Sequence, residues 1–143
     1  MAGERRTLKT NDECELKRVL IVDDEPRILR FVSISLVAHG YEVMTATSGL
    51  GALELITSQQ PDIMLLDMVI PQMSGLEVLQ KLRSFSRLPV IAFSANSSLS
   101  QKALEMGADD FLDKPFMPDE LLRRMEAILE HKGGISPEGN GAG

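Results

Sequence analysis

Five short apolar runs alternate along this chain with segments whose apolar residues recur every three or four positions. The runs have the length and aliphatic character of buried strands, and they cover residues 18–22, 41–46, 63–66, 89–93 and 110–112. The segment after each run has helical periodicity, and the last segment is the clearest case, with one apolar face formed by Leu121, Leu122, Met125, Ile128 and Leu129. Five strand–helix units in succession predict a parallel sheet with helices on both faces.

Capping signals set the ends of the predicted helices. Pro26 suits a first helical turn, and the helix that it opens stops at Gly40. Ser48 is a candidate N-cap for the second helix. The helix over residues 98–106 has the weakest pattern, and it ends at Gly107. The predicted fold class is α/β, a doubly wound, five-stranded parallel sheet of the flavodoxin-like (βα)5 kind with strand order 2-1-3-4-5.

One domain accounts for most of the chain. The sequence has 143 residues, of which 43% are hydrophobic, and this is enough for a single buried core. Residues 18–132 form the predicted domain. Residues 1–17 are polar and lack periodicity, and residues 133–143 are rich in glycine, so we predict a disordered extension and a flexible tail there.

Charge and cysteine content argue against several functions. The net charge of −6 argues against nucleic-acid binding by this domain itself, because such binding usually needs a basic face. The single cysteine, Cys14, cannot build a disulfide framework or a zinc site. The chain lacks an apolar run of membrane-spanning length and an apolar N-terminal signal segment. We therefore predict a cytoplasmic protein that is not bound to a membrane.

Carboxylates follow two of the predicted strands. Asp23 and Asp24 come directly after the first strand, and Asp67 ends the third. In strand order 2-1-3-4-5 these strands are neighbours at the topological switch point, which is where ligands bind in such sheets. Three carboxylates in one crevice repel one another unless a cation neutralises them, and oxygen ligands completed by water favour Mg²⁺. A turn or helix cap is the alternative role for Asp23 and Asp24.

Asp67 is the candidate for covalent chemistry, because a carboxylate can accept a phosphoryl group. Apolar residues flank it on both sides, where an unpaired charge is costly. Lys114 follows the fifth strand, Pro115 favours an extended conformation for it, and its ammonium can bind a phosphoryl oxygen. Ser94 ends the fourth strand and can donate a hydrogen bond to the same group. Each residue also has a structural alternative: an ion pair between Asp67 and Lys114, a surface turn at Lys114-Pro115, and a helix cap or loop hydroxyl at Ser94. The sequence leaves open whether the Lys114–Pro115 peptide bond is cis or trans.

In this order and at this spacing, these residues resemble the receiver domain of response regulators, the phosphoacceptor module of two-component signalling. The resemblance covers residues 18–131. It implies that Asp67 is the phosphoacceptor and that Lys114 and Ser94 act with it in phosphoryl transfer. It also implies a Mg²⁺ site, whose ligands are Asp24, Asp67 and the backbone carbonyl of Val69, with Asp23 acting through water.

The resemblance further implies a conformational switch driven by a sensor histidine kinase. In receivers the hydroxyl, here Ser94, moves toward the phosphoryl group, and an aromatic residue, here Phe111, turns into the space that it leaves. Phe111 fits a residue of the strand core equally well. Val69 and Asn96 occupy positions that vary across the family and modulate dephosphorylation.

The C-terminal part most resembles the receivers of winged-helix DNA-binding regulators, which dimerise through their fourth helix, fifth strand and fifth helix. Asp110 and Arg124 match a salt bridge between subunits in that subfamily, and Glu120 lies in the same segment. Gln101 replaces the usual apolar residue of this interface, and a solvated charged face is the alternative for the charged residues. The implied output is transcription through a DNA-binding domain after Gly143, and a receiver that stands alone is equally consistent with the residues present.

Two other functions fit parts of the pattern. A pseudo-receiver would keep the fold and bind partners without being phosphorylated, although this chain has every charged residue of the site. A Mg²⁺-dependent phosphohydrolase with an aspartyl nucleophile would need an Asp-x-Asp pattern on the first strand and a cap for its substrate, whereas Asp23 and Asp24 are adjacent. We therefore predict a signalling switch that catalyses only its own phosphoryl transfer and dephosphorylation, and not an enzyme.

Overall fold

The computed structural model describes residues 16–133, so the predictions for residues 1–15 and 134–143 lie outside the described part of the chain. The strands are β1 (Arg18–Val22), β2 (Glu42–Ala46), β3 (Ile63–Asp67), β4 (Val90–Ser94) and β5 (Asp110–Asp113). The helices are α2 (Pro26–Ala38), α3 (Gly49–Gln59), α4 (Gly75–Arg83), the 3-10 turn η2 (Ser97–Leu99), α5 (Ser100–Glu105) and α6 (Pro118–Gly133). None of these helices combines the length and the apolar character that a bilayer crossing requires.

The five strands form one parallel sheet in the order β2-β1-β3-β4-β5, which confirms the predicted α/β fold. Val22 pairs with Leu66, Asp67 pairs with Phe93, and Ser94 pairs with Asp113. The carboxyl ends of β1, β3, β4 and β5 therefore lie along the same edge of the sheet. Residues from four separate parts of the sequence can meet there.

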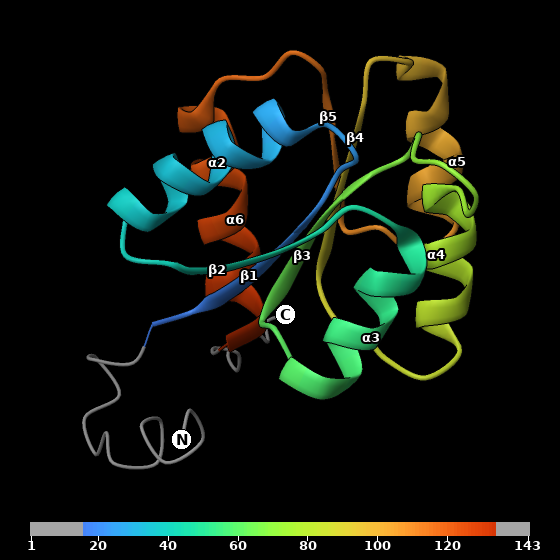
Figure 1. The fold of residues 1–143 in the computed structure, drawn as a ribbon, viewed down its shortest axis with the longest axis horizontal. Coiled ribbons are helices and arrows are strands. Elements are labelled where there is room, and N and C mark those ends of the chain that lie inside the picture. The colour runs from blue at the N-terminus through green and yellow to red at the C-terminus, as the bar shows by residue number, and fades with distance from the viewer. Residues whose placement is uncertain (1–15, 134–143) are drawn as a thin grey trace.

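Helices cover both faces of the sheet, with α2 and α6 on one side and α3, α4 and α5 on the other (Figure 1). Neighbouring residues of β1 enter different cores: Leu20 and Val22 pack under α3 and α4, while Val19 and Ile21 pack under α2 and α6. Every residue of β3 and β4 is buried because these strands are central and covered on both faces. This explains their continuous apolar sequence.

The segment predicted as one helix over residues 98–106 is divided in the structure. Its first turn is η2, in which the Asn96 side chain accepts a hydrogen bond from the Ser98 amide at 3.1 Å. Helix α5 follows, and Ala103 is its buried residue. Because only one side chain within α5 is buried, its sequence needs few apolar residues. This explains the weak apolar pattern of the segment.

Other boundaries differ from the predicted ones by one residue. β2 begins at Glu42 and not at residue 41, while β3, β4 and β5 each extend one residue further and end at Asp67, Ser94 and Asp113. The Lys114–Pro115 peptide bond, whose isomer the sequence leaves open, is cis.

The loop after β3 passes so close to helix α4 that residue 75 must be glycine. A Cβ atom on Gly75 would lie 2.6 Å from the Cα of Met68 and 2.7 Å from the carbonyl oxygen of Asp67. The helix begins immediately there, with a reciprocal capping box between Ser74 and Glu77. The backbone of Asp67 is thus pressed against the start of α4.

Gly75→Ala should lower the free energy of unfolding by about 1–3 kcal/mol, because the new methyl group must displace backbone atoms of Asp67 and Met68. Gly51→Ala is the matched control, since a Cβ there would meet a serine hydroxyl at 3.2 Å and no backbone. Urea unfolding measures both variants. Equal stability of the two variants would contradict the close approach at Gly75.

Candidate functional site

Main-chain hydrogen bonds beyond the ends of the strands position the residues at the carboxyl edge of the sheet. The Asp23 amide donates to the Ala46 carbonyl at 3.1 Å, so the pairing of β1 with β2 continues past β1. The Lys114 amide donates to the Ser94 carbonyl at 2.9 Å and extends the pairing of β4 with β5. Residues that follow the strands are therefore held almost as rigidly as the strands themselves.

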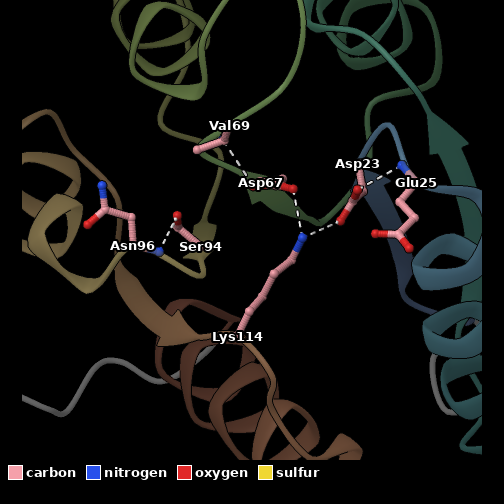
Figure 2. Close-up of polar contacts among 7 residues, drawn as sticks. All are labelled: Asp23, Glu25, Asp67, Val69, Ser94, Asn96 and Lys114. Carbon is pink, nitrogen blue, oxygen red and sulfur yellow. Dashed lines mark hydrogen bonds and ion pairs between the residues drawn. The ribbon is translucent and has the colours of Figure 1, made fainter.

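The ammonium of Lys114 bridges two carboxylates at the centre of this edge (Figure 2). Its Nζ atom lies 2.8 Å from Oδ2 of Asp67 and 3.1 Å from Oδ2 of Asp23. The other oxygen of each carboxylate accepts a backbone amide: Asp67 from Val69 and Asp23 from Glu25, both at 2.9 Å. Asp23 is 0% exposed and Asp67 is 4% exposed, so these contacts stabilise charges that are largely removed from water.

Aromatic packing supports the position of the Lys114 side chain. Its Nζ atom lies 5.3 Å from the centre of the Phe93 ring, which is within the range of a cation–π interaction. Phe93 in turn meets Phe116 edge-to-face, with 5.4 Å between the ring centres. Phe93, Phe116 and the Lys114 side chain therefore belong to one packed unit.

Asp24 completes an acidic cluster with Asp23 and Asp67. Carboxylate oxygens of the three residues all lie within 4.8 Å of one another. One ammonium faces three carboxylates, so negative charge remains in excess, and the donor atoms are all oxygen. This donor set fits a hard cation such as Mg²⁺, and Asp24 is exposed, so a bound ion could keep part of its water.

The pKa values of Asp67 and Lys114 are both raised, although burial acts on the two groups in opposite directions. Burial raises the pKa of Asp67, and the nearby charge of Asp23 adds to this rise, although Lys114 and the Val69 amide partly offset it. For Lys114, burial alone lowers the pKa, but the hydrogen bonds and charges of Asp67 and Asp23 outweigh this effect and raise it. Lys114 is consequently a firmly protonated cation, while ionised Asp67 is costly.

Ser94 and Phe111 lie next to this cluster rather than in it. Ser94 is 1% exposed, and it follows Phe93, the residue that pairs with Asp67. Its Oγ atom accepts a hydrogen bond from the Asn96 amide at 3.0 Å, which is the loop-hydroxyl role left open by the sequence. Phe111 is half-buried and packs against the core under α3, α4 and α5.

The predicted subunit-interface residues form a separate surface cluster, and they pair within one chain. The guanidinium of Arg124 lies 2.8 Å from Asp110 and 2.7 Å from Glu120. The Asp110–Arg124 bridge that the resemblance places between subunits is thus formed internally in this structure. Any pairing between subunits has to replace these contacts.

Arg83 is the residue that sequence reasoning missed. Its side chain donates to the Gly107 carbonyl through Nε at 3.1 Å and Nη2 at 2.8 Å, and to the Ser86 carbonyl at 3.1 Å. Asp109 lies 3.5 Å from the same guanidinium. No local pattern indicates a partner 24 residues away, because the contact depends on how α4 and α5 pack side by side.

The family model for the response regulator receiver domain matches residues 19–126. The chain belongs to this family. Receiver domains of two-component response regulators act as signalling switches, and the four residues gathered at the sheet edge, Asp23, Asp24, Asp67 and Lys114, are the ones that the resemblance predicted.

Relatives and solved structures agree with this assignment. The chain is 48% identical over 113 residues to the transcriptional regulatory protein KdpE of Mycobacterium tuberculosis and 44% identical over 115 residues to the response regulator MprA of Mycobacterium ulcerans. Each match covers 78% of this chain and 50% of the relative, so the chain spans about half the length of these regulators.

Two solved receiver domains show the same fold. A receiver domain of the Francisella response regulator 1452 superposes with a TM-score of 0.75 at 32% identity, covering 79% of this chain and 96% of that one. The beryllofluoride-activated receiver domain of Klebsiella pneumoniae RstA gives a TM-score of 0.76 at 27% identity, covering 80% and 100%.

The raised pKa of Asp67 makes stability depend on pH in a defined direction. An unfolded aspartate has a pKa of about 3.9, so above that value the folded protein holds more protons at Asp67 than the unfolded chain does. With a chelator present, wild type should therefore lose stability relative to Asp67→Asn as the pH rises from about 4 to 7. Urea unfolding of both proteins across this range measures the difference. A relative gain by wild type would contradict the assigned cause.

Proposed function

We propose that Asp67 accepts a phosphoryl group from the phosphohistidine of a sensor kinase. The contact that supports this most is the bridge from Lys114 to Asp67, at 2.8 Å, within a cluster of three carboxylates. The ammonium holds one oxygen of Asp67 in a fixed direction. The carboxylate is thereby oriented for attack on phosphorus.

The proposed reaction is an in-line phosphoryl transfer. An oxygen of Asp67 forms the new P–O bond as the P–N bond to the donor imidazole breaks, and the bonding electron pair stays on the leaving nitrogen. Lys114 moves its hydrogen bond from the carboxylate to a phosphoryl oxygen and balances charge there. Ser94, at the same sheet edge, donates a hydrogen bond from its hydroxyl to another phosphoryl oxygen.

Mg²⁺ is the proposed cofactor. The ligands would be Asp24, Asp67 and the backbone carbonyl of Val69, with Asp23 acting through water. When bound, the ion supplies positive charge that offsets the negative charge of the phosphoryl group. The excess of carboxylates over ammonium groups at the site supports this proposal.

The proposed output is transcription in the cytoplasm. The relatives KdpE and MprA are about twice as long as the matched segment, and KdpE is named as a transcriptional regulator. We propose that this receiver likewise controls a DNA-binding domain through the surface of α5, β5 and α6, and that Phe111 and Ser94 switch that surface together. The chain carries a net charge of −6, which does not favour direct DNA contact by this domain.

Acetyl phosphate with Mg²⁺ should add one phosphoryl group to wild type and none to Asp67→Asn, as measured by intact mass. Lys114→Met keeps the bulk of the side chain and removes its charge, so incorporation should slow roughly tenfold to a hundredfold, the range for losing one charge-assisted hydrogen bond. Thermal melting controls for folding of both variants.

The same experiment separates the alternatives. A protein that takes no phosphoryl group and shows no affinity for Mg²⁺ would be a pseudo-receiver. Rapid multiple turnover on assorted phosphate esters would instead indicate a phosphohydrolase. Labelling of Asp67→Asn to the wild-type level would contradict the assigned phosphoacceptor.

We also propose that phosphorylation favours a homodimer through α5, β5 and α6. Arg124 would exchange its internal bridge to Asp110 for the same bridge to a second copy. Sedimentation should then show a shift toward dimer on phosphorylation of wild type. Arg124→Ala should weaken this shift without slowing phosphate incorporation. A phosphorylated wild type that stays monomeric would contradict the proposal.

A further inference from the structure

The Lys114 side chain has to cross a whole strand to reach Asp67. Lys114 follows β5, Asp67 ends β3, and β4 lies between these two strands in the sheet. Neighbouring strands are about 5 Å apart, so the side chain bridges two such spacings. The strand that it crosses carries Phe93, which pairs with Asp67 on one side and with Leu112 on the other. Figure 2 shows the extended Lys114 side chain and the carboxylates that it reaches.

The Phe93 ring lies beneath the end of this crossing. Nζ of Lys114 lies over the ring, 5.3 Å from its centre, and Phe93 packs in the core under α2 and α6. The face of a phenyl ring attracts a cation, and this attraction is stronger where water is excluded. Phe93 is 1% exposed and the Lys114 side chain is 20% exposed. The ring therefore replaces part of the hydration that the ammonium loses.

The ring has a fixed place relative to Asp67. The Phe116 ring meets it edge-to-face, with 61° between the two ring planes. The backbone carbonyl of Phe93 accepts the Met68 amide at 2.9 Å, so this residue is also tied to the one that follows Asp67. A cation over the Phe93 ring is thus held at a defined position beside the Asp67 carboxylate.

In the proposed transfer, Lys114 gives up its bond to Asp67, because that carboxylate bonds to phosphorus. Asp23, at 3.1 Å from Nζ, and the Phe93 ring remain as neighbours of the ammonium. They lie on opposite sides of β3, since β1 and β4 are the two strands that flank it. Asp23 alone would draw the ammonium toward β1. We propose that Phe93 holds the Lys114 ammonium over β3, against the pull of Asp23, where the phosphoryl oxygen enters.

This inference rests on the proposed phosphorylation of Asp67 and adds Phe93 to it as a positioning residue. Phe93 acts through Lys114 and forms no bond to the phosphoryl group. A residue that only fills the core would be replaceable by any apolar side chain of the same shape. The electron-rich face of the ring is what the positioning role requires.

A series of fluorinated phenylalanines at residue 93 tests this requirement. One, two and three ring fluorines weaken the attraction of the face for a cation step by step, while the shape of the side chain changes little. Phosphoryl incorporation from acetyl phosphate with Mg²⁺, followed by intact mass, should slow at each step, and by roughly twofold to tenfold with three fluorines. Phe93→Leu, which removes the ring, should slow it at least as much.

Ile91→Val is the matched control for packing. Ile91 lies on the same strand, is 0% exposed and belongs to the same core as Phe93. Loss of a methylene group there should lower the melting temperature and leave the rate of phosphoryl incorporation unchanged. Slowing of Ile91→Val as large as that of Phe93→Leu would contradict a specific role for the ring.

A second measurement needs no phosphoryl donor. The ring current of Phe93 should move the Cε proton resonances of Lys114 upfield in the NMR spectrum of wild type. Phe93→Leu should abolish this upfield shift. Along the fluorinated series the shift should shrink, as the ammonium moves from the ring toward Asp23.

The two measurements separate this inference from the proposed function. If wild type takes no phosphoryl group, the phosphoacceptor proposal fails, and the Cε resonances still decide whether the ring holds the ammonium. Incorporation rates that stay level across the fluorinated series would overturn the positioning role. Cε shifts that are the same in wild type and Phe93→Leu would overturn it as well.

Discussion

The bridge from Lys114 to Asp67 and Asp23 is the interaction on which the rest of this site depends. Three carboxylates gather within 4.8 Å at the carboxyl edge of the sheet, and the ammonium is the charge that makes the burial of Asp23 and Asp67 tolerable. It leaves an excess of negative charge, which suits a bound cation. It also fixes one oxygen of Asp67 at 2.8 Å from Nζ.

The fold holds the ends of β1 and β3 more firmly than it holds η2 and α5. β1 and β3 are fully covered, and their ends hold the carboxylates by backbone contacts at Glu25 and Val69. β4 leads directly into η2 and α5, where Ala103 is buried and Leu99 and Met106 pack partly buried against the core.

Sequence pattern predicted the sheet and the central cluster well, because both depend on local signals. Continuous apolar runs identify strands covered on both faces, and parallel strand order brings Asp23, Asp67 and Lys114 to one edge. The pattern could not give the partners of Arg83, because that contact depends on how elements 24 residues apart pack. The resemblance paired Arg124 with Asp110 of a second subunit, whereas the structure pairs them within one chain. The divided helix at η2 and α5 was also missed, because a weak apolar pattern does not locate a break.

The most direct test of this account is to locate the phosphoryl group chemically. Borohydride reduces an aspartyl phosphate to homoserine, which peptide mass spectrometry identifies at a single position. After treatment with acetyl phosphate, the account predicts homoserine at residue 67 alone, in amounts that fall when Mg²⁺ is removed or Asp24 is changed to Asn. Homoserine at residue 23 or 24, or labelling that is indifferent to Mg²⁺, would contradict it.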